Sequence, residues 1–240
     1  MRGCLTFLLL VIVTILVASW LFLPAVAGGA VVAALGSAGF TGSPASATVS
    51  SDPPIELLGG HADRIVIQAR DAMFHELSAA TVDLTLTDVG LIDRTAGIVS
   101  GTLTGIRMVP RSGHVLPVSS AKLSGSSSAI QARLSLSLAD VSAIAASALT
   151  SAAGGAPSKV TLAAPDKVSI VVSGVTVSGR LAVDGQGGLV FRSTATSLAI
   201  TGPIDLIRPG PGVPIRIRTV ALTASGAILT ATVDPAAFSG

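Results

Sequence analysis

Aromatic residues are scarce in this chain: they make up 3% of its 240 residues, and tyrosine is absent. Sites that recognise sugars, bases or quaternary amines stack their ligands on aromatic faces, so the composition argues against those ligand classes. Charged residues are also few, at 12%, and no run of lysine or arginine supplies the basic footprint of a nucleic-acid-binding protein. We therefore expect no nucleic-acid partner.

Cysteine is nearly absent, and the recognised catalytic motifs are missing. The single Cys4 lies at the edge of an apolar N-terminal segment, so the rest of the chain tolerates an oxidising compartment without disulfides. His61, His75 and His114 each lack a partner at metal-ligand spacing, and no Gly-x-Ser-x-Gly elbow occurs. The sequence therefore predicts neither enzyme activity nor a metal or other cofactor.

Aliphatic residues, by contrast, are abundant, and half of the chain is hydrophobic. Residues 5–23 carry no charge and, as a helix, would extend about 28 Å, close to the thickness of a bilayer core. We predict a membrane anchor or a secretory signal within residues 1–27, and export of the remainder in either case. The expected location is the cell envelope, with the domain outside a plasma membrane that holds the anchor, or secretion if the segment is cleaved.

The next stretch changes in composition. Residues 28–54 are rich in Ala, Gly, Ser and Pro, which predicts a linker, and an exported domain is expected over residues 55–240. The small, apolar residues 24–40 at the start of this stretch have three interpretations: an extension of the membrane helix, a short second helix or a spacer. Within that domain, apolar and polar residues alternate over several segments, the pattern of strands with one dry face. These segments are 64–70, 77–89, 130–138, 168–172, 175–183, 189–200, 215–222 and 227–233.

One helix is predicted beyond the N-terminal segment. Between Leu138 and Leu149, apolar residues recur every three or four positions, while Ser137 is placed to cap the helix and Asp140 lies in its first turn. The predicted class is α+β, mostly β, with one extended twisted antiparallel sheet packed around this amphipathic helix.

Turns and interruptions follow the glycines and prolines. Residues 184–188, DGQGG, link two strand patterns and predict a hairpin turn rather than a phosphate-binding loop. Gly101 and Gly105 break the pattern of residues 98–109, where bulges or bends are expected. The four prolines of residues 203–214 predict a loop.

The aliphatic strand faces allow two interpretations: a well-filled core, or a cleft between sheet and helix that accepts acyl chains. Each buried methylene is worth about 0.8 kcal/mol, so a partly engulfed lipid tail would bind usefully. The candidate lining residues are Val82, Leu84, Leu86, Leu134 and Leu136 from strands, Leu138, Val141, Ile144 and Leu149 from the helix, and Val220 and Leu222 near the closing hairpin.

Four arginines also have two interpretations. Arg216 and Arg218 alternate with isoleucines, and Arg64 and Arg70 flank the first strand pattern. They form either the wet side of a sheet or a basic rim for anionic lipid headgroups, because guanidinium groups bind phosphate in a bidentate fork.

Several segments together resemble the LmeA-type phospholipid-binding proteins of the actinobacterial cell envelope. The resemblance covers roughly residues 55–235 and depends on pattern and order: ADRIVIQARD (62–71), ATVDLTLTDVGL (80–91), RLSLSLADVSAIAASAL (133–149), VSGVTVSGRLAVDGQGGLVF (172–191) and PGVPIRIRTVALTASGAILTATV (211–233). It implies a fold similar to tubular lipid-binding domains and an envelope protein that binds phospholipid, with phosphatidylinositol-type lipids as candidates.

We therefore expect a membrane-anchored, exported phospholipid-binding protein of the cell envelope that sequesters or transfers lipid through an aliphatic cleft. The alternative is a non-catalytic structural or interaction module of the envelope, with a filled core and a protein partner bound at a sheet edge.

Overall fold

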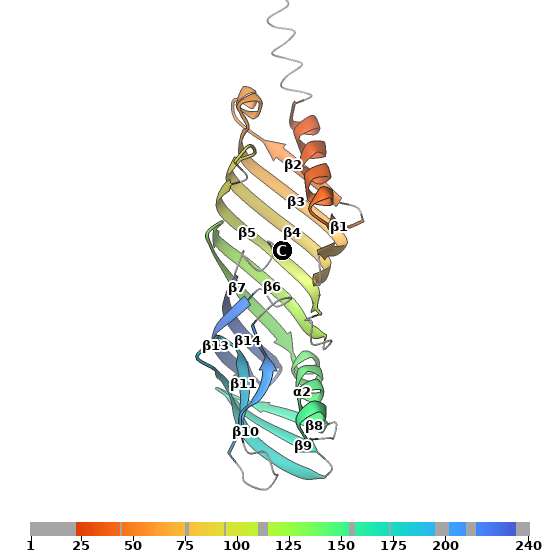
Figure 1. The fold of residues 1–240 in the computed structure, drawn as a ribbon, viewed down its shortest axis with the longest axis vertical. Helices are drawn as coiled ribbons and strands as arrows, with labels where there is room; N and C mark the ends of the chain where they lie inside the picture. Colours follow the sequence, from red (N-terminus) through yellow and green to blue (C-terminus); the bar gives the residue numbers. More distant parts are fainter. Residues whose placement is uncertain are drawn as a thin grey trace, which may run out of the picture.

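The computed structural model describes residues 23–43, 45–74, 77–93, 95–109, 115–153, 157–172, 174–194, 202–209 and 215–233. The molecule is elongated and mostly β, as predicted, with its strands in antiparallel sheets (Figure 1). The predicted membrane segment falls outside the described residues, except for Leu23 at its end. Among the helices that are described, none is both long and apolar enough to cross a bilayer.

A nine-stranded sheet forms most of the molecule's length. Its strands lie in the order β1-β3-β4-β5-β6-β7-β14-β13, and β2 also pairs with β3. Their bounds are β1 Phe40–Thr41, β2 Ala45–Ser50, β3 His61–Phe74, β4 Leu77–Gly90, β5 Thr95–Met108, β6 Leu116–Ser126, β7 Ala129–Ser137, β13 Ile215–Thr223 and β14 Gly226–Val233.

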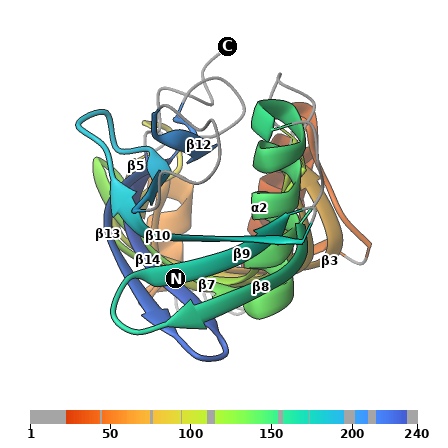
Figure 2. The same ribbon diagram turned by 90° about the horizontal axis from the view of Figure 1, so that it is seen from below.

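A second sheet of five strands lies at the lower end of the molecule in Figure 1, inserted in the chain between β7 and β13. Its order is β12-β11-β10-β9-β8, and from below its strands β8, β9 and β10 extend across that end (Figure 2). The prediction of a single sheet was therefore wrong, because alternation identifies strands but not their partners. The bounds are β8 Pro157–Ala163, β9 Lys167–Val172, β10 Val175–Val183, β11 Leu189–Ser193 and β12 Ile204–Ile207.

Two hairpins confirm the predicted turns, and one predicted loop contains a strand. Residues 184–188 join β10 to β11, where the Asp184 carboxylate accepts the backbone N–H groups of Gln186 and Gly188 at 2.9 and 2.7 Å. The closing hairpin pairs β13 with β14. Within the predicted loop of residues 203–214, however, β12 pairs with β11, so its described part is not simply a loop.

Two rows of unpaired residues run across neighbouring strands of the large sheet. The register of the strands is the same on both sides of each row. One row passes through Asp71, Ala80, Gly105 and Ser119, and the ladders of β3 to β6 lack a pair there. Asp71 and Gly105 have φ of 47° and 57°, and at this row the residues that face inwards shift by one position along each strand. The break predicted at Gly105 is therefore part of an interruption that four neighbouring strands share.

The second row lies nearer the upper end and includes Asp88, whose φ is 54°. Its position is opposite Asp63 on β3 and Gly97 on β5. A Cβ added to Gly97 would lie 2.9 Å from Asp88 Oδ2, so glycine provides room for the carboxylate. Between the rows the inward face is regular, with Ile65, Ile67 and Ala69 of β3 buried as the alternation predicted.

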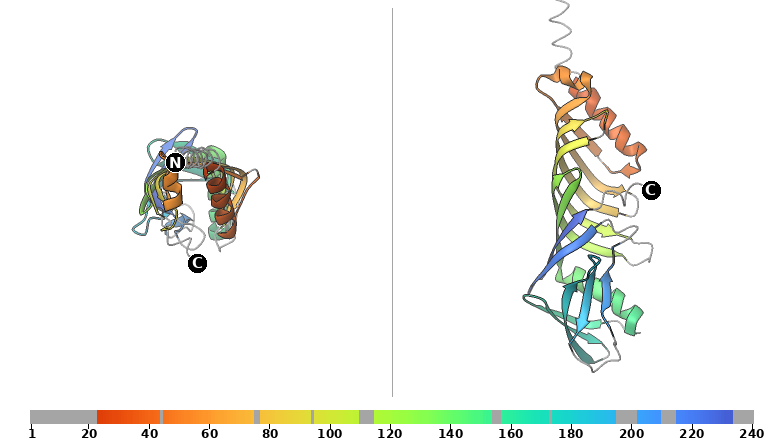
Figure 3. Two further views of the ribbon diagram at one scale, coloured as in Figure 1. Left: turned by 90° about the horizontal axis from the view of Figure 1, so that it is seen from above. Right: turned by 60° about the vertical axis from the view of Figure 1, so that its left-hand side comes forward.

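The expected linker is in large part ordered structure. Residues 23–37 form a helix, which we call the upper helix, along the inner face of the sheet, and β2 pairs with β3 (Figure 3). Leu23, Ala27, Val31 and Leu35 of the helix pack on a buried cluster at the upper end, which we call the upper core. The folded domain therefore begins well before residue 55. The upper core consists of Val49, Leu57, Ala62, Ile65, Ile67 and Val89.

The predicted second helix is α2, Leu138–Ala153, and its N-terminus is capped as expected. The Asp140 backbone N–H donates to Ser137 Oγ at 3.1 Å, and the Ser137 backbone N–H donates to Asp140 Oδ2 at 2.8 Å. This reciprocal pair satisfies two backbone donors that the helix leaves unpaired. Its buried stripe includes Val141, Ile144 and Ala145, whereas Leu138 is 36% exposed.

Candidate functional site

An entirely apolar groove of about 340 Å³ lies on the inner face of the nine-stranded sheet. Leu35 and Phe40 bound it on the side of the upper helix, and Ile215 and Val233 bound it on the side of the second sheet. Its remaining lining comes from β3 to β7 and contains no charged or polar residue: Ala72, Met73, Phe74, Leu77, Val82, Leu84, Val99, Leu103, Ile106, Met108, Val118, Ala121, Leu123, Ile130, Ala132 and Leu134.

The groove exists because several side chains of its wall are small and because the wall is only partly covered. Ala72, Ala121 and Ala132 place only methyl groups in the lining. The upper helix ends at residue 37 and α2 begins at Leu138 further down the molecule, so no helix of the described residues covers the sheet between them (Figure 3). Leu103 and Leu123 are only partly buried, which shows that the lining reaches solvent.

The structure places some of the predicted site residues in this groove. Val82, Leu84 and Leu134 line it. Leu86 instead packs against the upper core, and Leu136 is buried but does not line the groove. The strand faces were therefore predicted correctly, but the pattern did not show which part of each face is left uncovered.

The helical and C-terminal candidates lie elsewhere. Val141 and Ile144 are buried at 5% and 3%, where α2 packs against β8 and β12 of the second sheet and against β6, β7 and β14. Leu222 is buried and Val220 half-buried in the same core, and neither lines the groove. The groove thus lies above α2, not between α2 and the sheet as predicted; Leu138 is partly exposed, and the side chain of Leu149 lies outside the described part.

A second hollow, of about 570 Å³ and lined by both polar and apolar residues, adjoins the same strands and includes Asp71, Arg107 and Asp140. The hydroxyl of Ser119 on β6 donates to Asp140 Oδ2, which links the sheet to the start of α2. Partial burial acts to raise the pKa of Asp140, but the hydrogen bonds from Ser119 and Ser137 outweigh it and hold the pKa below its ordinary value. This carboxylate therefore has a structural role in joining sheet and helix.

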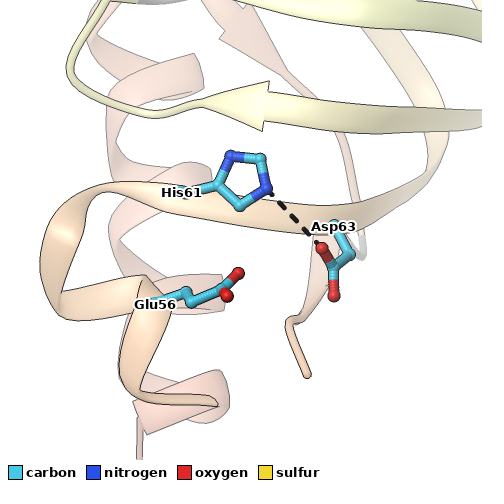
Figure 4. Close-up of side chains that lie close together, drawn as sticks. All are labelled: Glu56, His61 and Asp63. Carbon is cyan, nitrogen blue, oxygen red and sulfur yellow. Dashed lines mark ion pairs between the residues drawn. The ribbon is translucent and has the colours of Figure 1, made fainter. Parts of the chain in front are cut away.

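His61 was predicted to lack a partner, but the structure places two carboxylates beside it. It offers a ring nitrogen close to the carboxylates of Glu56 and Asp63, with ligand atoms all within 4.8 Å of one another (Figure 4). His61 Nε2 lies 3.6 Å from Asp63 Oδ1, and the Asp52 backbone N–H donates to Asp63 Oδ2 at 2.7 Å. The signal that was missed is the spacing of two on β3, which puts positions 61 and 63 on one face.

This cluster has donors of the kind that bind divalent cations. It is also a surface feature, because the side chains of His61 and Asp63 are 43% and 48% exposed. The other ring nitrogen of His61 lies 4.0 Å from Asp88 Oδ1. We assign the cluster to ion pairing at the upper end; His75 and His114 lie outside the described residues.

The arginines considered for a basic rim are exposed. Arg216 and Arg218 on β13 alternate with the buried Ile215 and Ile217, and Arg64 and Arg70 face outwards from β3. They do not line the groove.

Comparison of the chain with protein-family models, with curated proteins and with solved structures finds no match.

Proposed function

We propose that this protein is a phospholipid-binding module of the cell envelope and that the groove holds a lipid acyl chain. The observation that carries the proposal is the groove's lining, which is apolar throughout and only partly covered. Sites for small ligands are concave and mostly apolar, with volumes of roughly 300–1,000 Å³. An acyl chain is the ligand that such a lining favours, since it needs no hydrogen-bonding partner.

The same proposal includes a retained N-terminal anchor. Leu23 and Ala27 pack on the upper core, so cleavage near Ala27 would remove part of a packed helix. Retention would tether the domain outside the plasma membrane, close to a supply of phospholipid. The resemblance to the LmeA-type family agrees with this location and with an anionic, phosphatidylinositol-type ligand.

The alternative is a structural module with a filled interior. It gives no reason for an aliphatic wall that the described residues leave only partly covered between two helices, because exposing such a surface to water costs about 25 cal/mol for each Å². We therefore favour lipid binding and, with it, a non-enzymatic role.

The test is to fill the groove from within. Ala121→Phe would project a phenyl ring from β6 into the groove, where Ala121 is 3% exposed. Lys122→Phe is the matched control, because Lys122 is the next residue on the same strand and is exposed on the opposite face. Lipid that co-purifies with each full-length variant would be extracted and quantified per protein by mass spectrometry.

We expect Ala121→Phe to lower the bound phospholipid severalfold relative to both the wild type and Lys122→Phe, with the circular dichroism spectrum unchanged. Lipid that is bound around the anchor is the same in all three proteins and cancels in the comparison. Equal lipid content in the three proteins would refute binding in the groove.

A further inference from the structure

Large aliphatic side chains are exposed together at the upper end of the molecule. Ile55 and Leu58, in the 3-10 turn η1 (Pro54–Gly59), are 52% and 68% exposed. Ile92, in the turn between β4 and β5, is 75% exposed. Its side chain lies beside Gly60, where an added Cβ would be 2.6 Å from Ile92 Cδ1. We call Ile55, Leu58 and Ile92 the apolar tip.

The backbone beneath the apolar tip is held firmly. Leu57 is buried in the upper core between the two exposed residues of η1, and the Leu91 backbone N–H donates to the Gly60 carbonyl at 2.7 Å. Both turns are therefore fixed to the end of the sheet, and their side chains remain exposed although an apolar core is adjacent. An exposed group of large aliphatic side chains of this kind marks an interaction surface.

The chain itself indicates what covers this surface. The uncharged segment of residues 5–23 ends at Leu23, which packs on the same upper core as Leu57. Val26, in the first turns of the helix that follows, is 70% exposed. A membrane anchor that ends here would bring the apolar tip to the surface of its own bilayer (Figure 1).

The charges around the tip indicate how it would bind. Among the described residues at this end, the carboxylates of Glu56, Asp63 and Asp88 lie close to His61. Carboxylates repel anionic headgroups, which leaves the burial of aliphatic side chains as the attractive contribution. Full burial of one isoleucine or leucine side chain is favourable relative to its exposure in water.

We propose that the apolar tip inserts into the interfacial layer of the phospholipid bilayer, so that the sheet stands on the membrane by a second contact beside the anchor. This inference rests on the anchor of the proposed function. It adds an orientation: the upper end is immersed, and the second sheet lies farthest from the membrane. Apolar residues on rigid turns suit such insertion because their backbone is already ordered, so little conformational entropy is lost on binding.

The test uses the full chain in phosphatidylcholine nanodiscs, which expose both membrane faces to solvent. In a Cys4→Ser background, Leu58→Cys, Ile92→Cys and Val175→Cys would each carry one environment-sensitive fluorophore. Val175 is the control, because it is 39% exposed and lies on β10 at the opposite end of the molecule (Figure 1). Quenching by aqueous iodide and by doxyl-labelled lipid would be measured at each position.

We expect iodide quenching at positions 58 and 92 to be severalfold weaker than at 175, and quenching by doxyl lipid to occur at 58 and 92 alone. Iodide access at 58 and 92 equal to that at 175 would overturn the proposal, since a tether alone leaves the tip in water. The same labels in the Ala121→Phe variant should be protected equally, so this result is independent of whether the groove holds lipid.

Discussion

At the residue scale, Asp140 connects the first turn of α2 to the nine-stranded sheet. Its carboxylate accepts hydrogen bonds from the Ser119 hydroxyl on β6 and from the Ser137 backbone N–H at the helix start. These donors favour the ionised form over the protonated one, and they lower the pKa of Asp140 although partial burial opposes them. The ionised carboxylate therefore stabilises the folded state more than the protonated form does.

This arrangement predicts a pH dependence of stability. Because the pKa of Asp140 is lower in the folded state than its ordinary value of 3.8, its contribution is present above that pH and is lost as the pH falls through the folded-state pKa. The difference in unfolding free energy between the wild type and Asp140→Asn should therefore be constant near neutral pH and shrink below about pH 4. Urea denaturation at a series of pH values measures it.

Ser119→Ala supplies the control for that measurement, because it removes one donor and keeps the carboxylate. Its acid-dependent loss should be smaller than that of the wild type. A wild-type minus Asp140→Asn difference that stays constant down to pH 2 would show that the hydrogen bonds do not favour the charged form.

At the scale of elements, the upper helix lies close to β2 because a glycine faces the strand. A Cβ added to Gly28 would lie 2.3 Å from the Ala47 carbonyl oxygen, whereas one added to Gly29 would meet nothing within 4 Å. Gly28 is buried and Gly29 is exposed. The same substitution at these neighbouring positions should therefore have opposite effects.

Gly28→Ala should destabilise the folded protein, by about 1–3 kcal/mol, because the helix must move away from a backbone atom. Gly29→Ala should stabilise it by about 0.5–1 kcal/mol, because alanine loses less conformational freedom than glycine in a helix. Thermal or chemical unfolding monitored by circular dichroism compares the two. A stabilising Gly28→Ala would mean that the helix does not pack on β2 as described.

The elements also show which features the hydrophobic periodicity of the sequence could predict and which it could not. Alternation identified the buried faces of β3 and β7, and the change of period at residue 138, with Ser137 and Asp140, predicted α2 and its cap correctly. Pairing is a long-range property, so neither the second sheet nor the pairing of β14 with β7 followed from local pattern. The helix at residues 23–37 was one of three interpretations of the small apolar residues 24–40, and their glycine-rich composition did not single it out from a membrane-helix extension or a spacer.

At the scale of the whole molecule, two helices cover the two ends of one long apolar face, and within the described part of the chain no helix covers its centre. The sequence predicted an excess of aliphatic wall, and Val82, Leu84 and Leu134 do line the groove. It predicted the wrong position along the wall, because α2 is covered by a sheet whose existence was not foreseen. The location of an uncovered surface depends on where distant segments end, which no local pattern records.

The most direct measurement is photocrosslinking with a phospholipid that carries a diazirine near the end of one acyl chain. The full-length protein would be irradiated with this lipid, and the labelled peptides would be located by mass spectrometry. We predict labels on the inner face of β4 to β7, at residues such as Leu103, Ala121 and Leu134, and their loss in Ala121→Phe. Labels confined to residues 1–23, or spread equally over inner and outer faces, would contradict acyl-chain binding in the groove.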